Sequence, residues 1–188
     1  MPSKPRCKIC GELASIKVPA GHFCSIEHVY QHARNLQDRA KAAKERKAKQ
    51  EHRKRKQALK SRSEWLKEAQ AIFNKYIRLR DVDQPCISCQ RHHQGQYHAG
   101  HYLTVGARPE LRFNPKNCSK QCSACNLHLS GNLINYRINL IKKIGLEEVE
   151  KLEGPHEPLK LSIEEIKELI AEYKAKVKEL LANQKETG

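Results

Sequence analysis

The sequence predicts a mostly α-helical protein that carries small zinc-bound β-hairpins, a long basic helix and an N-terminal zinc finger. The first observation is that six of the eight cysteines form pairs with CxxC spacing, which is typical of metal knuckles. The second is a run rich in Lys, Arg, Ala, Glu and Gln, without Gly or Pro, which has the composition of a helix. The third is that apolar residues make up only 38% of the 188 residues. Metal binding can stabilise small units where hydrophobic burial is scarce.

The composition of the chain indicates which kinds of partner to expect. Lys and Arg number 36 against 21 Asp and Glu, a formal net charge of +15, which favours a polyanionic partner. No apolar stretch is long enough for a membrane span, and the first residues lack the apolar core of a signal peptide. We therefore expect a cytoplasmic protein without a membrane partner.

Residues 1–33 are expected to form the N-terminal zinc finger. Three thiols and one imidazole suit a structural zinc ion, and the expected ligands are Cys7, Cys10, Cys24 and His28. His22 or His32 could take the place of His28. Such a finger could contact nucleic acid, contact protein or cap the helix that follows.

Residues 34–62 are expected to form a basic helical linker, and the helical composition continues to about residue 80. The window holds 13 basic and 3 acidic residues and has no apolar stripe. A solvated face is the usual interpretation of such a run. Because acids do not balance it, we favour contacts with DNA phosphates, made by Arg46, Lys47, Arg53, Lys54, Arg55, Lys56, Lys60 and Arg62.

Residues 63–145 are expected to form a zinc-stabilised core. Apolar residues at helical spacing after Ser63 predict a helix that docks on this core. Residues 84–116 contain Pro and Gly residues at intervals typical of hairpins and loops. Helix is expected after Asn117, with a break near Ser130. Two CxxC knuckles place four thiolates around one zinc ion, namely Cys86, Cys89, Cys122 and Cys125.

The loop between these knuckles contains a His–Asn–CxxC–Asn order that resembles the HNH, or His-Me finger, nuclease motif. In that ββα-metal architecture a β-hairpin and a helix hold one divalent ion. A neutral imidazole can deprotonate water, and an Asn carbonyl can orient that imidazole. We therefore expect His101 as general base, Asn117 as its orienter or a loop fastener, and Asn126 as a ligand of Mg2+ or Mn2+. His98 and His128 are further candidates at the metal or the phosphate. The alternative is that His101 is a structural histidine, or an extra zinc ligand, in a non-catalytic finger.

Residues 146–188 are expected to form a C-terminal helical region. Ser162 followed by Glu165 has the spacing of a capping box. The apolar stripe of the helix that follows, with residues such as Ile166 and Tyr173, is a candidate homodimer interface.

Several segments together resemble the NinG/Rap recombination proteins of lambdoid phages. They are Ser63-Glu-Trp-Leu-Lys-Glu-Ala-Gln, Pro85-Cys-Ile-Ser-Cys, Ala99-Gly-His-Tyr, Leu111-Arg-Phe-Asn, Lys120-Gln-Cys and Ser130-Gly-Asn. The resemblance implies a structure-selective, metal-dependent endonuclease that cuts Holliday junctions and D-loops, with phage recombination proteins as possible partners. Two positions depart from the family pattern, since we expect an acidic residue where His98 stands and a cysteine where His28 stands.

Two other functions remain open at this point. One is a non-catalytic, zinc-dependent DNA-binding protein that assists recombination. The other is a sequence-specific HNH nicking enzyme.

Overall fold

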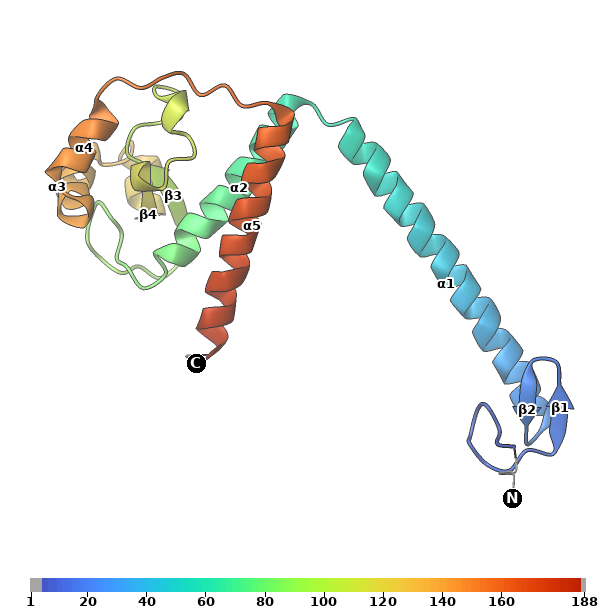
Figure 1. The fold of residues 1–188 in the computed structure, drawn as a ribbon. Helices are drawn as coiled ribbons and strands as arrows, with labels where there is room; N and C mark the ends of the chain where they lie inside the picture. The colour runs from blue at the N-terminus through green and yellow to red at the C-terminus, as the bar shows by residue number, and fades with distance from the viewer. Residues whose placement is uncertain (1–4, 187–188) are drawn as a thin grey trace. The chain divides into compact units, whose positions relative to one another are not determined.

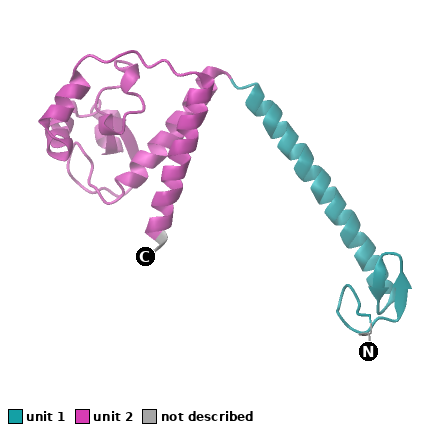
Figure 2. Ribbon diagram, in the orientation of Figure 1, with its two compact units in different colours: residues 1–60 teal, residues 61–188 magenta. Residues whose placement is uncertain are grey.

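The computed structural model describes residues 5–186, which fall into two compact units with a boundary between residues 60 and 61 (Figure 2). The first unit contains β1 (Ile16–Val18), β2 (Gly21–Phe23) and α1 (Ile26–Ala58) (Figure 1). The second contains α2 (Arg62–Arg80), β3 (Tyr97–His101), β4 (Cys118–Cys122), α3 (Leu133–Ile144), α4 (Leu146–Glu153) and α5 (Ile163–Glu186). Three short helical turns complete it, η1 (Pro109–Leu111), η2 (Pro115–Asn117) and η3 (Ala124–His128).

The first unit is a small finger followed by a long helix. β1 and β2 pair antiparallel, with Ile16 opposite Phe23. Ser25 caps α1, because its hydroxyl accepts a hydrogen bond from the amide of His28. α1 runs for 33 residues and buries none of them, as its composition predicts. It begins at Ile26, earlier than the predicted position 34.

The helical composition up to residue 80 is divided between two helices. α1 ends at Ala58 and a new helix starts at Ser61, whose side chain accepts from the amide of Glu64. The Glu64 carboxylate accepts the Ser61 amide in return, so the two residues form a capping box. This second N-cap breaks the helix, and the unit boundary falls there.

The main core of the second unit lies between α2 and α5, which run side by side (Figure 1). It joins the apolar faces predicted for both helices, together with two residues of the segment between them. The buried members are Trp65, Ala69, Phe73, Ile77, Phe113, Cys118, Ile166, Ile170 and Tyr173. The capping box at Ser162 and Glu165 is confirmed by both of its hydrogen bonds.

This packing corrects two expectations. Residues 146–188 do not form a separate region, because α5 belongs to the core of α2. The apolar stripe of α5 is covered by that contact, since Ile166, Ile170 and Tyr173 are at most 4% exposed, so this stripe is not open for a dimer interface.

A two-stranded hairpin lies in the middle of the second unit. β3 and β4 pair antiparallel, with Tyr97 opposite Cys122 and His101 opposite Cys118. The sequence predicted helix after Asn117, but residues 118–122 form a strand in which every residue is buried. A second apolar core joins α3 and α4 to the loop after β3 through Tyr102, Leu111, Tyr136, Leu140, Val149 and Leu152, with Ile87 of the first knuckle.

Large aliphatic side chains from η3 to α3 are exposed, namely Leu127, Leu129, Leu133, Ile134 and Ile138. Among the described residues, no helix has the length and hydropathy needed to cross a membrane.

Candidate functional site

The knuckle cysteines of the second unit converge as their spacing predicts. Cys86 and Cys89 lie on the turn after α2, Cys122 ends β4, and Cys125 lies in η3. Their four sulfur atoms lie within 4.8 Å of one another, and none is in a disulfide. Four thiols at these separations fit one tetrahedral Zn2+ with Zn–S bonds of about 2.3 Å.

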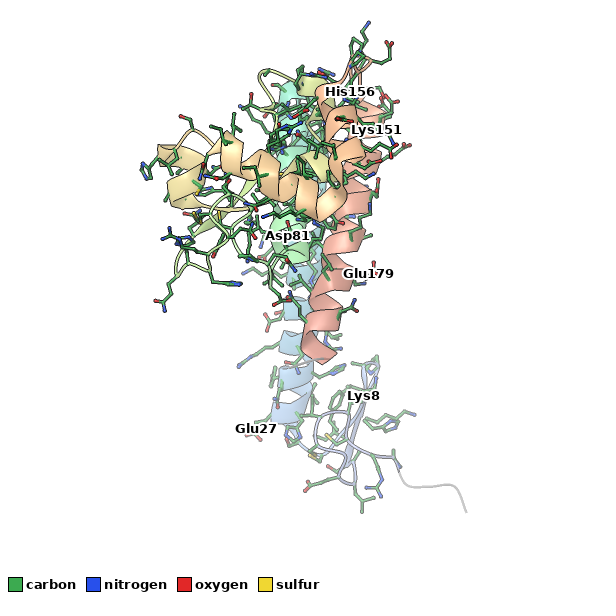
Figure 3. All side chains as sticks on the ribbon, turned by 90° about the vertical axis from the view of Figure 1, so that its left-hand side faces the viewer. Lys8, Glu27, Asp81, Lys151, His156 and Glu179 are labelled. Atoms are coloured by element: carbon green, nitrogen blue, oxygen red, sulfur yellow. The ribbon has the colours of Figure 1, made fainter. Side chains whose placement is uncertain are left out.

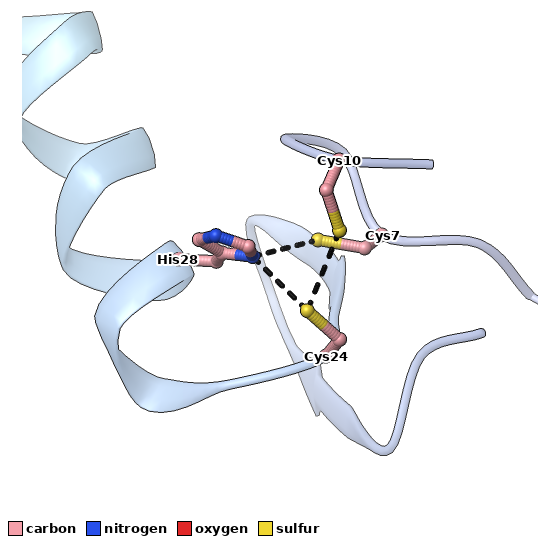
Figure 4. A group of neighbouring side chains, drawn as sticks. All are labelled: Cys7, Cys10, Cys24 and His28. Carbon is pink, nitrogen blue, oxygen red and sulfur yellow. Dashed lines mark hydrogen bonds between the residues drawn. The ribbon is translucent and has the colours of Figure 1, made fainter. Parts of the chain in front are cut away.

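The finger of the first unit brings together a second ligand group. Sγ atoms of Cys7, Cys10 and Cys24 and a ring nitrogen of His28 lie within 4.8 Å of one another (Figure 4). His28 Nδ1 is 3.0 Å from the Cys24 sulfur and 3.5 Å from that of Cys7. His28 is therefore the imidazole of this group, and His32 instead packs its ring against Phe23, with 5.2 Å between centroids.

A strand places alternate side chains on opposite faces. Tyr97, Ala99 and His101 therefore share one face of β3, and His98 shares the other with Gly100. Ala99 packs on the α2–α5 core, as does the ring of His101. The side chain of His98 instead meets Ser123, with 3.0 Å between Nε2 and Oγ. The hairpin thus separates the two histidines that the sequence motif groups together.

His101 lies against α2, at the end of β3. Its Nε2 is 3.0 Å from the carbonyl oxygen of Arg112, and its ring centroid is 6.0 Å from that of Phe73. A carbonyl only accepts, so Nε2 carries the proton and Nδ1 keeps its lone pair. Burial lowers the pKa of His101 below its usual value of 6.5. The imidazole is therefore neutral near pH 7 and holds one tautomer.

Two groups set the surroundings of this imidazole. Cys118 Sγ, on the paired residue of β4, is 3.8 Å from Nδ1, and burial raises the pKa of this thiol far above its usual value. Arg112 is itself held by α2, since its Nε donates to Oε1 of Gln70 at 2.9 Å. The orienting carbonyl of Arg112 belongs to the backbone, and the sequence therefore carried no signal for it.

Asn117 fastens the loop after β3 and does not orient His101. It is fully buried, its Oδ1 accepts from the Leu103 amide at 2.9 Å, and its Nδ2 donates to the carbonyls of Leu103 and Leu111. Of the two roles that the motif left open, the structure supports the loop fastener.

Asn126 and His128 lie on the helical turn η3, between the cluster cysteine Cys125 and α3. Asn126 is half-buried and His128 is exposed. Within residues 5–186, the two cysteine clusters are the groups of three or more Cys, His, Asp or Glu side chains that are close enough to hold a metal. His98, His101 and His128 do not add a third group of that kind.

The predicted DNA-contacting residues lie on α1 and around its end. Six of them, Arg46, Lys47, Arg53, Lys54, Arg55 and Lys56, are exposed on α1. Arg55 pairs with Glu51 one turn earlier at 2.8 Å. Lys60 lies in the break between the helices, and Arg62, in the first turn of α2, donates to the carbonyl of Leu161. The helix presents most of these charges to solvent without a packing role.

The fold and its ligand groups define a basic protein of two units, each of which carries one cysteine-rich cluster suited to zinc. The family model described as "Bacteriophage Lambda NinG protein" matches residues 1–184. The chain is 48% identical to "Protein ninG" of Escherichia phage lambda over 124 residues, which cover 66% of this chain and 61% of that protein. It is 42% identical to "Protein ninG" of Escherichia phage 933W over 198 aligned positions, which cover 100% of this chain and 98% of that one. The chain therefore belongs to the NinG family of lambdoid phages, and no solved structure matches it.

Proposed function

We propose that this chain is a structure-selective, metal-dependent endonuclease that hydrolyses phosphodiester bonds in branched recombination intermediates, such as Holliday junctions and D-loops. The observation that carries the proposal is the state of His101. It is a neutral imidazole whose Nε2 is engaged with a backbone carbonyl and whose Nδ1 keeps its lone pair, 3.8 Å from the Cys118 sulfur, on a hairpin that the cysteine cluster closes. This is the state that a general base needs near neutral pH.

The reaction would use His101 as follows. Nδ1 takes a proton from water, the water oxygen attacks phosphorus, and the bond to the 3′ oxygen breaks, with that oxygen protonated from solvent as it leaves. Mg2+ or Mn2+, when bound, would supply Lewis-acid charge at the scissile phosphate. We propose an HNH-like core in which Asn126 and His128 on η3 would hold this ion. η3 follows Cys122, which pairs with Tyr97 at the opposite end of β3 from His101, so ion and base reach one phosphodiester only if the DNA strand crosses the hairpin. The side chain of Asn126 has no hydrogen-bond partner among the described residues, and His128 is exposed beside it.

The charge distribution supports a DNA substrate. α1 carries 11 basic and 4 acidic residues and buries none of them. Such a helix binds phosphates without sequence preference, and its affinity falls steeply with salt. Contacts of this kind suit a protein that recognises branched DNA and does not recognise a particular base sequence.

We also propose that the protein works as a homodimer in the host cytoplasm, alongside other phage recombination proteins, because symmetric resolution of a four-way junction needs two nicks. The exposed aliphatic residues of η3 and α3, such as Ile134 (79% exposed) and Ile138 (49%), offer an apolar face for the second copy.

The test uses purified protein, a labelled four-way junction and Mg2+ or Mn2+. Wild type should cut the junction, and His101→Ala should lower the rate by at least about 100-fold, the usual contribution of a general base, with junction affinity unchanged. His156→Ala provides the matched control, because its imidazole is hydrogen-bonded to the carbonyl of Leu152 and lies outside the proposed site.

Other results of this cleavage assay would support the alternative functions. If wild type binds the junction but cuts no strand, the protein is a non-catalytic zinc-dependent DNA-binding accessory. If a linear duplex is cut as fast as a junction of the same sequence, the protein is a sequence-specific nicking enzyme. If His101→Ala loses binding together with cutting, His101 is structural.

A further inference from the structure

A polar cavity of about 210 Å³ lies in the second unit, between the turn after α2, the outer edge of β4 and the C-terminal end of α3. The residues that line it include three lysines, Lys120, Lys142 and Lys143, and a single carboxylate, Asp81. Asp81 lies at the C-terminal end of α2 (Figure 3). Neither the proposed hydrolysis nor the zinc clusters use this cavity.

The one carboxylate of the cavity is already saturated. Asp81 is 3% exposed and accepts two hydrogen bonds from the guanidinium of Arg80, at 2.8 and 2.7 Å. It also accepts the amide of Lys120 at 3.1 Å and Nζ of Lys143 at 3.0 Å. Its negative charge is therefore neutralised within the protein.

The remaining lysines supply positive charge without a carboxylate partner. Nζ of Lys120 donates to the carbonyl of Val82 at 2.7 Å and lies 4.5 Å from the centre of the Tyr97 ring. Nζ of Lys142 contacts only the amide oxygen of Asn139, at a long 3.4 Å. Among the described residues, neither ammonium is within ion-pair distance of an Asp or Glu. A cavity with this excess of cationic donors favours an anion.

We infer that this cavity binds a phosphate group, in the proposed function a backbone phosphate of the DNA, with Lys142 and Lys143 as the contacting ammonium groups. Phosphate offers several acceptor oxygens to such donors. Asp81 and Arg80 do not contact the phosphate. They hold Lys143 in place, and the hydroxyl of Ser119 bonds the same Nζ at 3.1 Å.

The position of the cavity suits a phosphate near the one that is cut. Ser119 and Lys120 follow Cys118, which pairs with His101 across the hairpin. With about 4.8 Å between strands and about 3.3 Å per residue, the cavity begins on the order of 10 Å from the strand position of His101. Neighbouring phosphates of one DNA strand can bridge that separation. The identification of the ligand as a DNA phosphate rests on the proposed function. The presence of an anion site does not.

The first test uses inorganic phosphate and the full-length, zinc-loaded protein. Phosphate should raise the midpoint of thermal unfolding above that in chloride of equal ionic strength, because a ligand that binds only the folded state stabilises it. Lys142→Ala should remove at least half of this rise. Lys142→Arg should keep it, because the positive charge remains. Lys178→Ala is the matched control, since Lys178 is an exposed lysine of α5 outside the cavity lining.

The second test measures affinity for a four-way junction, without cleavage, in a buffer free of divalent ions. Lys142→Ala should weaken binding roughly threefold to tenfold and reduce the salt slope by about 1, while Lys178→Ala should leave both unchanged. A rise with phosphate but normal junction binding would assign the site to free phosphate and overturn its role in DNA contact. No rise in wild type, or equal effects of Lys142→Ala and Lys178→Ala, would overturn the site itself. Both measurements can succeed in a protein that cuts nothing, so failure of the proposed hydrolysis is a separate outcome.

Discussion

Gly100→Ala tests the packing that fixes the central hairpin. The side chain of Gln121 crosses Gly100 so closely that a methyl group there would overlap its Oε1 and lie 3.0 Å from its Cβ and Cδ. The backbone of Gly100 is ordinary, so alanine brings no conformational strain of its own. The whole effect therefore comes from displacement of Gln121.

The expected cost follows from what Gln121 must give up. Its Nε2 donates to Oγ of Ser88 at 2.7 Å and to the carbonyl of Gly131 at 2.6 Å, and the residue is 1% exposed. Overpacking costs about 1–3 kcal/mol, and a buried polar group left without its partner costs about 1–3 kcal/mol. The movement relieves part of the overlap, so we expect a decrease of about 2–4 kcal/mol in the free energy of unfolding.

Urea unfolding followed by tryptophan fluorescence measures this decrease, because Trp65 is the only tryptophan and lies in the core of the second unit. Gly106→Ala is the control, since no atom lies within 4 Å of the added methyl group. In a Gln121→Ala background, Gly100→Ala should cost less than about 1 kcal/mol. If Gly100→Ala and Gly106→Ala cost the same in the wild-type background, the close packing of Gln121 over Gly100 is refuted.

Three further predictions concern the metal, the basic helix and pH. Metal analysis should find two zinc ions per chain, and Cys24→Ser should lower this number to one. Because the two clusters lie in different units, Cys24→Ser should leave the urea unfolding reported by Trp65 unchanged. A value of one zinc ion in the wild type would contradict the first site. Replacement of the four cationic residues 53–56 by glutamine should lower the salt slope of junction binding by about 0.9 for each DNA phosphate that is no longer neutralised, and an unchanged slope would exclude α1 as a phosphate-contacting helix. The pKa of His101 is lowered by burial, so the unfolded chain binds a proton at this residue at a higher pH than the folded protein does. The free energy of unfolding should therefore decrease as pH falls below about 6.5. An NMR titration of the His101 ring with a midpoint above 6.5 would contradict this environment.

The sequence predicted the local ligand sets and the apolar helix faces well. CxxC knuckles place two sulfurs from a single tight turn, so their spacing alone indicates a metal group such as Cys86 and Cys89. The faces of α2 and α5 could be read in the same way, because one-sided burial leaves a helical period.

The strand β4 could not be read in this way. Both of its faces are covered, so Cys118, Ser119, Lys120, Gln121 and Cys122 are all buried and show no alternation between apolar and polar residues. Ser119, Lys120 and Gln121 are polar in sequence and buried by tertiary partners, such as the carboxylate of Asp81 for the Lys120 amide. These partners are distant in sequence, and a local pattern could not contain this information.

The same reasoning explains why the histidine motif misleads about geometry. His98 and His101 are three residues apart, which is compatible with one face of a helix but with opposite faces of a strand. Any cation bound by His98 would lie on the side of Ser123, with the strand backbone between it and Nδ1 of His101. One phosphodiester could reach both only around the end of β3, where His101 is the last residue. The presence of His98 where the family pattern has an acidic residue therefore affects the side of the strand that faces Ser123 and η3. The proposed role of His101 as a base does not depend on the residue at position 98.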